Sequence, residues 1–174
     1  GSASVLGIDP ASGDAAWRAR LGIVLQSAGF FEALTPREIT AHFASFYPTP
    51  LDVDSVVEMV GLKEKRDARC KNLSGGQKRR VDLALGIVGN PELIFLDEPT
   101  TGLDPQGRRQ IWEVVRNFTA LGKTVLLTTH YLDEAERCDR GALMHFGKLA
   151  ALGPIGELNS TFADRPIVAR SGPN

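Results

Sequence analysis

Three apolar runs constrain the fold most strongly, because each is short, continuous and followed by polar residues. They read RLGIVLQ, LIFLDE and TVLLTTH, and they end at Gln26, at Asp97 and Glu98, and at His130. Apolar runs without alternation are typical of strands that are buried on both faces of a parallel sheet. In open α/β sheets, ligands bind beyond the carboxyl ends of the strands. The sequence therefore predicts an α/β fold that brings the polar ends of three strands to one edge.

Helices are predicted between these runs. Thr35-Pro36-Arg37-Glu38 has the form of a capping box, so a helix is expected to follow it. A second helix is expected over residues 54–60, ended by Gly61, and a third from Asp104-Pro105 to just before Gly122. Residues 2–7 are interpreted as a short strand and residues 140–153 as a hairpin. Beyond residue 160 the periodicity is lost, which leaves a loose tail or the start of another element.

The tripeptide Gly122-Lys123-Thr124 is similar to the end of the phosphate-binding loop G-x-x-x-x-G-K-[ST], but Asn117 stands where the first glycine is required. It also follows a helix and precedes a strand, whereas a phosphate loop needs the reverse order so that a helix N-terminus faces the anion. Lys123 is instead explained as a favourable charge at a helix C-terminus. We therefore interpret this segment as a helix end.

Composition excludes some classes of partner. The formal net charge of −1 gives no bulk attraction to nucleic acid or to an anionic membrane surface. The apolar runs are far shorter than the roughly 18 residues that a membrane-spanning helix needs. Cys70 and Cys138 are isolated in the sequence, which fits a reducing cytosol better than a disulfide framework.

The segment NLSGGQKRR, residues 72–80, is a candidate anion site. Ser74 is a good N-cap, and Gly75 and Gly76 allow close approach to the backbone at the start of a helix. Exposed N–H groups, a hydroxyl and the positive end of a helix dipole favour an anion there. An ordinary glycine turn before a helix is an equally good interpretation of this segment alone.

The segment LIFLDEPTTGLD, residues 93–104, places two adjacent carboxylates at the end of a buried strand. One of the two carboxylates can hold magnesium through water, and the other can orient or deprotonate an attacking water molecule. A solvated acidic turn is the alternative. His130 could hydrogen-bond a phosphoryl group from the same edge, and Gln26 could hold a water molecule or a metal ion. His42 and His145 lack such placement and are interpreted as structural.

The chain resembles the ATPase domain of ABC transporters over about residues 1–158. The resemblance is carried by LSGGQ, LIFLDEPTTGLD and TTH, in this order and after a strand that ends in glutamine. The phrases LTPREI and TTHYLDEAERCDR further resemble drug and antibiotic exporters of the daunorubicin-resistance type. The resemblance implies a P-loop NTPase-like three-layer sandwich, here partial, with a helical subdomain. It implies a catalytic core at 1–30 and 73–158 and a helical subdomain at 31–72, whose signature helix continues to about 89. Residues 159–174 would be a C-terminal tail.

The resemblance also implies roles for individual residues. Glu98 would be the catalytic base, His130 the switch histidine and Gln26 the Q-loop residue that senses magnesium. Asp97 would be the Walker B aspartate and, with Gln26, the metal site. The nucleotide would be bound by the signature motif and the D-loop aspartate, that is by Ser74, Gly75, Gly76, Gln77 and Asp104.

The cofactors implied by the resemblance are ATP and Mg²⁺. The implied partners are a transmembrane permease subunit, received near Phe30 and Phe31, and a second ATP-binding domain, as in a homodimer. The protein would then lie in the cytoplasm, peripherally on the inner face of the cell membrane. No partner role for nucleic acid is implied.

The family also carries a Walker A loop, G-x-x-x-x-G-K-[ST], before the Q-loop, and this sequence has no match to it. We expect that the chain is a truncated fragment and is inactive by itself, because the Walker A loop supplies most phosphate contacts. Loss of the preceding strand and helix would open the edge of the His130 strand and uncover apolar side chains.

Two alternatives to an exporter ATPase remain at this point. One is an ABC-like module without catalytic activity, which contributes only its signature surface to a partner ATPase. The other is an ABC protein that acts in translation or repair, although the drug-exporter phrases argue against it.

Overall fold

The computed structural model describes residues 1–26, 32–161 and 168–171. The predicted permease contact at Phe30 and Phe31 lies outside these ranges. The strands are β1 (Leu21–Val24), β2 (Leu93–Asp97), β3 (Thr124–Thr128), β4 (Arg140–His145), β5 (Lys148–Pro154) and β6 (Val168–Ser171). The helices are α1 (Ala15–Ala19), α2 (Pro36–Ala44), α3 (Val53–Met59), α4 (Gly75–Ile87), α5 (Pro105–Ala120), α6 (Leu132–Ala135) and α7 (Ile155–Thr161). Short 3₁₀ turns lie at Pro10–Ser12, Lys63–Lys65 and Cys70–Asn72.

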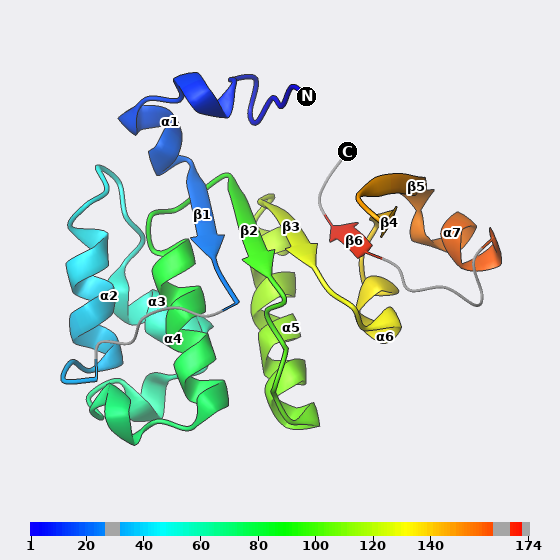
Figure 1. Cartoon of the computed structure of the whole chain (residues 1–174). Coiled ribbons are helices and arrows are strands. Elements are labelled where there is room, and N and C mark those ends of the chain that lie inside the picture. Colours follow the sequence, from blue (N-terminus) through cyan, green and yellow to red (C-terminus); the bar gives the residue numbers. More distant parts are fainter. Residues whose placement is uncertain (27–31, 162–167, 172–174) are drawn as a thin grey trace.

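The three apolar runs form neighbouring parallel strands, as predicted. Ile23 of β1 lies opposite Phe95 of β2, and Phe95 lies opposite Leu126 of β3. All three strands therefore end at the same edge of the sheet, which is also where α4 and α5 begin (Figure 1). This arrangement fulfils the predicted α/β class and brings the polar residues after each strand to one place.

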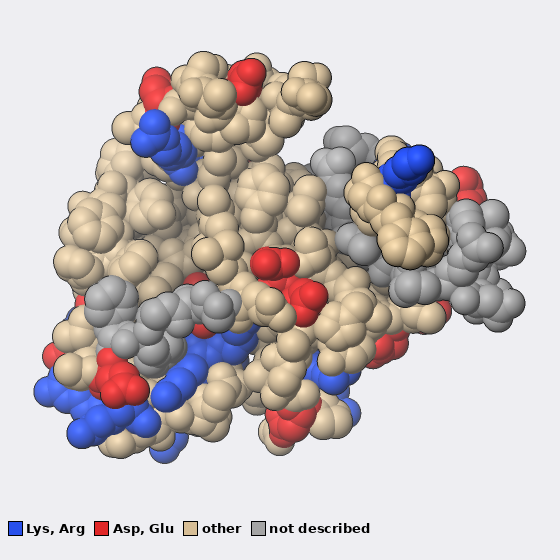
Figure 2. Space-filling view, viewed as in Figure 1, with Lys and Arg blue, Asp and Glu red and all other residues tan. Residues whose placement is uncertain are grey.

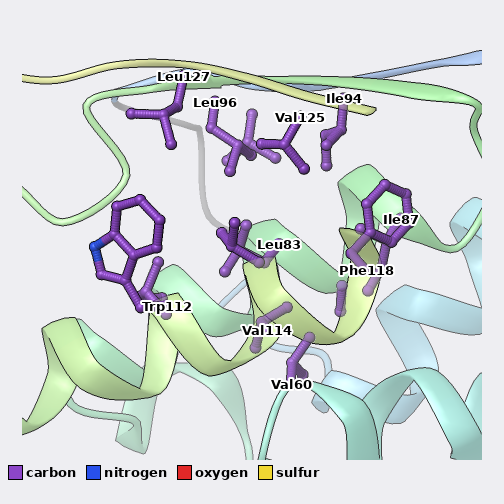
Figure 3. Packing of buried hydrophobic residues seen from close by; sticks show 14 of the residues in the cluster. Val60, Leu83, Ile87, Ile94, Leu96, Trp112, Val114, Phe118, Val125 and Leu127 are labelled. Atoms are coloured by element: carbon purple, nitrogen blue, oxygen red, sulfur yellow. The ribbon is translucent and has the colours of Figure 1, made fainter. Parts of the chain in front are cut away.

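The core lies between this sheet and the helices α4 and α5. Side chains from β2 and β3 point toward both helices, and Phe118 of α5 and Leu83 of α4 meet them, each 1% exposed (Figure 3). Helix α4 and strand β1 also approach closely through two glycines, because a Cβ at Gly22 would lie 2.2 Å from the carbonyl oxygen of Gly86. The position of α4 relative to β1 is thus fixed by backbone contact.

The opposite face of β1–β3 has no helix over it within the described ranges (Figure 1). Ile23 and Leu25 are 61% and 58% exposed, and this face is largely free of charged side chains above the acidic group where β2 ends (Figure 2). The uncovered apolar side chains that the sequence predicted are therefore present.

The C-terminal strands extend the sheet in the order β1-β2-β3-β6-β4-β5. The predicted hairpin forms from β4 and β5 and turns at Phe146 and Gly147, both with positive φ. The predicted open edge of the His130 strand was wrong, because β6 pairs antiparallel with β3 at Val125 and Leu126. The sequence left a loose tail or a further element as alternatives for the chain beyond residue 160. Within the described residues, the structure has a further element there, the strand β6.

Helix ends follow the predicted signals closely. The Thr35 hydroxyl accepts from the Glu38 N–H at 3.1 Å, and the Glu38 carboxylate accepts from the Thr35 N–H at 2.8 Å. Helix α5 begins after the N-cap Asp104, and Gly122, with φ 77°, follows its end. Because Gly122 is in the left-handed region at a helix C-terminus, the interpretation of Gly122-Lys123-Thr124 as a helix end is confirmed.

One predicted strand does not form. At residues 2–7 the chain reverses at Leu6 and Gly7, both with positive φ, and only an isolated bridge joins Val5 to Ile8.

None of the helices within the described ranges combines the length and the hydropathy that crossing a bilayer requires.

Candidate functional site

The carboxylate of Glu98 is the centre of the side-chain cluster at the ends of the parallel strands. Gln26, two residues after β1, donates from Nε2 to Glu98 Oε2 at 2.9 Å. His130, two residues after β3, places Nδ1 3.6 Å from Glu98 Oε1. The hydroxyl of Thr101 also donates to Glu98 Oε2, at 3.0 Å. Gln26 and His130, which are both far from Glu98 in the sequence, therefore converge with the nearby Thr101 on one carboxylate.

The backbone of Glu98 is in the left-handed region, with φ 42°. L-residues adopt this conformation at a cost of roughly 1–2 kcal/mol. The Glu98 N–H donates to the Thr128 hydroxyl at 3.0 Å. This backbone turn directs the side chain toward Gln26 and His130, and the hydrogen bond to Thr128 offsets part of its conformational cost.

Asp97 is the last residue of β2 and lies beside this cluster. Its Oδ1 accepts from the Thr128 hydroxyl at 2.6 Å, and Thr128 pairs with it across the β2–β3 ladder. The residue is exposed, so a ligand can reach its carboxylate from solvent. Thr128 thus links both acidic residues, since it accepts from the Glu98 N–H and donates to Asp97.

A second feature, the signature turn, comprises Ser74–Gln77 at the start of α4. The Ser74 hydroxyl accepts from the Gln77 N–H at 3.2 Å, and the Gln77 carbonyl oxygen accepts from the Ser74 N–H at 2.9 Å. The turn is therefore a capping box, and the cap uses the Ser74 oxygen as an acceptor without using its hydrogen. The N–H groups of Gly75 and Gly76 point out of the first helical turn, as the first amides of any helix do.

The signature turn lines a cavity of about 460 Å³ together with the start of α5. Asp104 is the N-cap of α5, and its Oδ1 accepts from the Gly107 N–H at 2.9 Å. Two helix N-termini thus border one cavity, which favours an anionic ligand. The residues predicted for nucleotide binding, Ser74–Gln77 and Asp104, all line it.

Sequence reasoning missed several polar residues of this region. Thr128 is the last residue of β3, and its hydroxyl at a strand end could have been noted in the sequence. Glu134 is 1% exposed, and its carboxylate accepts from the hydroxyls of Thr100 and Thr129. Arg79 is 7% exposed on the inward face of α4, four residues before the buried Leu83, but the adjacent Lys78 and Arg80 are also basic, so the sequence did not single it out.

Comparison with known proteins identifies the family of the chain. The ABC transporter family model matches residues 1–101. The Nod factor export ATP-binding protein I of Neorhizobium galegae is 41% identical over 100% of this chain and 52% of its own length. The daunorubicin/doxorubicin resistance ATP-binding protein of Streptomyces peucetius is 40% identical over 98% of this chain and 53% of its own. The chain thus spans about half the length of these curated relatives.

Solved structures give the same fold. An ATP-binding subunit of an ABC transporter superposes with a TM-score of 0.76 at 26% identity, over 92% of this chain and 69% of that one. A dimeric ATP-binding cassette in a post-hydrolysis state with ADP and phosphate gives 0.74 over 87% of this chain and 72% of that one, and at 23% identity it shows the fold alone. The predicted P-loop NTPase-like α/β class is therefore confirmed, and the chain belongs to the ABC transporter family as part of an ATP-binding domain.

Proposed function

We propose that this chain is part of the ATP-hydrolysing subunit of an ABC exporter, and that Glu98 is its general base. The observation that carries the proposal is the convergence of Gln26, Thr101 and His130 on the Glu98 carboxylate. A general base needs a fixed position and a lone pair directed at its water molecule. Hydrogen bonds from Gln26 and Thr101 fix Oε2, and they leave Oε1 on the side of His130.

The donor set also fits the magnesium ion that accompanies ATP. Mg²⁺ takes oxygen ligands and keeps several waters, so it needs only one or two protein groups. The exposed carboxylate of Asp97 and the amide oxygen of Gln26, whose nitrogen donates to Glu98, are such groups. When bound, the ion would neutralise charge on the phosphates. His130 would donate to a phosphoryl oxygen from the same edge.

The signature turn would meet the nucleotide of a second ATP-binding domain. Its free Ser74 hydroxyl hydrogen and first-turn amides suit phosphate oxygens, and the positive end of α4 favours them. We propose a homodimer with two such sites, attached to a permease at the inner face of the membrane. The names of the relatives, which export Nod factors or confer drug resistance, support export of a small organic compound.

The test is steady-state ATP hydrolysis by the full-length protein, comparing wild type with E98Q. Glutamine keeps the shape of the side chain but cannot accept a proton, so turnover should fall about 10²–10⁴-fold while ATP binding persists. The matched control is E113Q, which changes an exposed glutamate of α5 and should leave turnover unaffected. Wild-type turnover by E98Q would reject the assignment of the base.

The alternative, a module that lends only its signature turn to a partner ATPase, draws on the separate cavity at Ser74–Gln77. It makes a different prediction for the same assay. Full-length wild-type protein would then hydrolyse no ATP by itself, and hydrolysis by the partner would be lost on replacing Ser74 and unaffected by E98Q.

A further inference from the structure

Arg79 is a buried cation on the face of α4 that is turned toward the sheet. It is 7% exposed, and burial lowers the pKa of its guanidinium, while the charges of Asp82 and Asp97 partly offset this effect. A guanidinium stays protonated in proteins, so a buried one must find hydrogen-bond acceptors for its five N–H groups. The positions of these acceptors show which parts of the backbone Arg79 holds together.

Among the described residues, Arg79 donates three hydrogen bonds, all to backbone carbonyls at the ends of the parallel strands. Nη1 donates to Leu25 O at 2.5 Å, Nη2 to Asp97 O at 2.9 Å, and Nε to Pro99 O at 3.0 Å. These carbonyls belong to the residue before Gln26 and to the two residues that flank Glu98. One rigid planar group therefore holds the backbone on both sides of the hydrogen bond between Gln26 and Glu98.

The same side chain ties these strand ends to the signature turn. Arg79 lies five residues after Ser74 in one helix, and α4 is fixed against β1 by the close approach of Gly22 and Gly86. The ion pair that Arg79 forms with a carboxylate among the described residues, that of Asp82, spans 3.8 Å, beyond hydrogen-bond distance. Ion pairing is therefore secondary to the carbonyl contacts within the described structure.

We propose that Arg79 is a positioning residue that fixes Gln26 and Glu98 relative to each other and to the signature turn. The proposal rests on the proposed function, because it assigns Arg79 to the geometry of that site. A base displaced by about 1 Å can lose on the order of 10²-fold in rate, so loss of this clamp should lower kcat. Arg79 is buried and its donors are turned to backbone carbonyls, so KM should change much less than kcat.

The test compares ATP hydrolysis by full-length wild type, R79M and R79K. R79M keeps the aliphatic stem and removes all donors, and its kcat should fall at least about 10-fold with KM within about 3-fold. R79K keeps the charge, but an ammonium on a flexible stem cannot span three carbonyls, so kcat should stay well below wild type. R79K also decides the question if R79M does not fold.

R20M is the matched control. Arg20 also joins β1 to β2, through hydrogen bonds of 2.7 and 2.9 Å to Glu92, but at the opposite end of the strands. A general effect of removing an inter-strand arginine would lower kcat in R20M as well, whereas the positioning role predicts wild-type kcat there.

The outcomes separate this proposal from the proposed function. Wild-type kcat in R79K or R79M, with E98Q inactive, would overturn the role of Arg79 and leave the function standing. Equal losses of kcat in R79M and R20M would also overturn it. If wild-type full-length protein hydrolyses no ATP, the proposed function fails and the role of Arg79 fails with it.

Discussion

Replacing Asp82 by asparagine should stabilise the protein at neutral pH but not at acidic pH. Asp82 lies on α4, one turn after Arg79, and its side chain is 13% exposed. Burial raises the pKa of its carboxyl from 3.8 to about 6, and the charge of Arg79 lowers it only in part. The ionised form is therefore disfavoured in the folded protein relative to the unfolded chain.

The sign of the pH dependence follows from this direction. The folded protein binds the Asp82 proton more tightly than the unfolded chain does, so the stability that this proton contributes is fully present below about pH 4. It is lost as the pH rises through about 6. The pKa difference is about 2 units, which at 1.36 kcal/mol per unit amounts to at most about 3 kcal/mol.

The assay is urea unfolding of wild type and D82N at several pH values between 4 and 7.5. The free energy of unfolding should be similar for both at pH 4, and D82N should be more stable by up to about 3 kcal/mol at pH 7. D54N is the control, because Asp54 is an exposed partner of Arg37 and should contribute less than about 1 kcal/mol. A wild-type-to-D82N difference that does not change with pH would refute the reasoning, as would a less stable D82N at pH 7.

Two further predictions concern the core. F118A should lower the free energy of unfolding by about 3–5 kcal/mol, because Phe118 is 1% exposed between α5 and the sheet; a loss below about 1 kcal/mol in urea unfolding would contradict the packing described here. E134A should cost about 2–5 kcal/mol, since it leaves the buried hydroxyls of Thr100 and Thr129 without their acceptor. E134Q, which keeps an acceptor oxygen, should lose less, and the exposed E113A should lose little; equal losses in all three would argue against the hydrogen bonds.

The sheet edge could be predicted from the sequence because it follows from local patterns. Each apolar run carries its own polar terminus, and parallel strands bring such termini together whatever the details of packing. This is why Gln26, Asp97 and His130 could be assigned to one place. The helix caps at Thr35 and Ser74 were predictable for the same reason, since their signals lie within four residues.

The contacts within the cluster could not be predicted in this way. The direction of Glu98 depends on its left-handed backbone, which the neighbouring Thr128 stabilises and which no propensity of glutamate favours. Arg79 stands between Lys78 and Arg80 in a basic run, and only its position on the inward face distinguishes it. The pairing of β6 with β3 joins residues more than forty positions apart through a segment without periodicity.

The position of β6 has a consequence for how the molecule opens. Within the described structure, β6 is the only strand that hydrogen-bonds both to the parallel strands and to the β4–β5 hairpin, at Val125 and Leu126 on one side and at residues 140–142 on the other. The sheet therefore consists of the parallel strands β1–β3 and the β4–β5 hairpin, joined by one four-residue strand. Proteins often unfold locally in contiguous cooperative units that coincide with supersecondary motifs such as a hairpin. Amide hydrogens of the hairpin should thus exchange with solvent in a step that leaves β1–β3, and with them Glu98, protected.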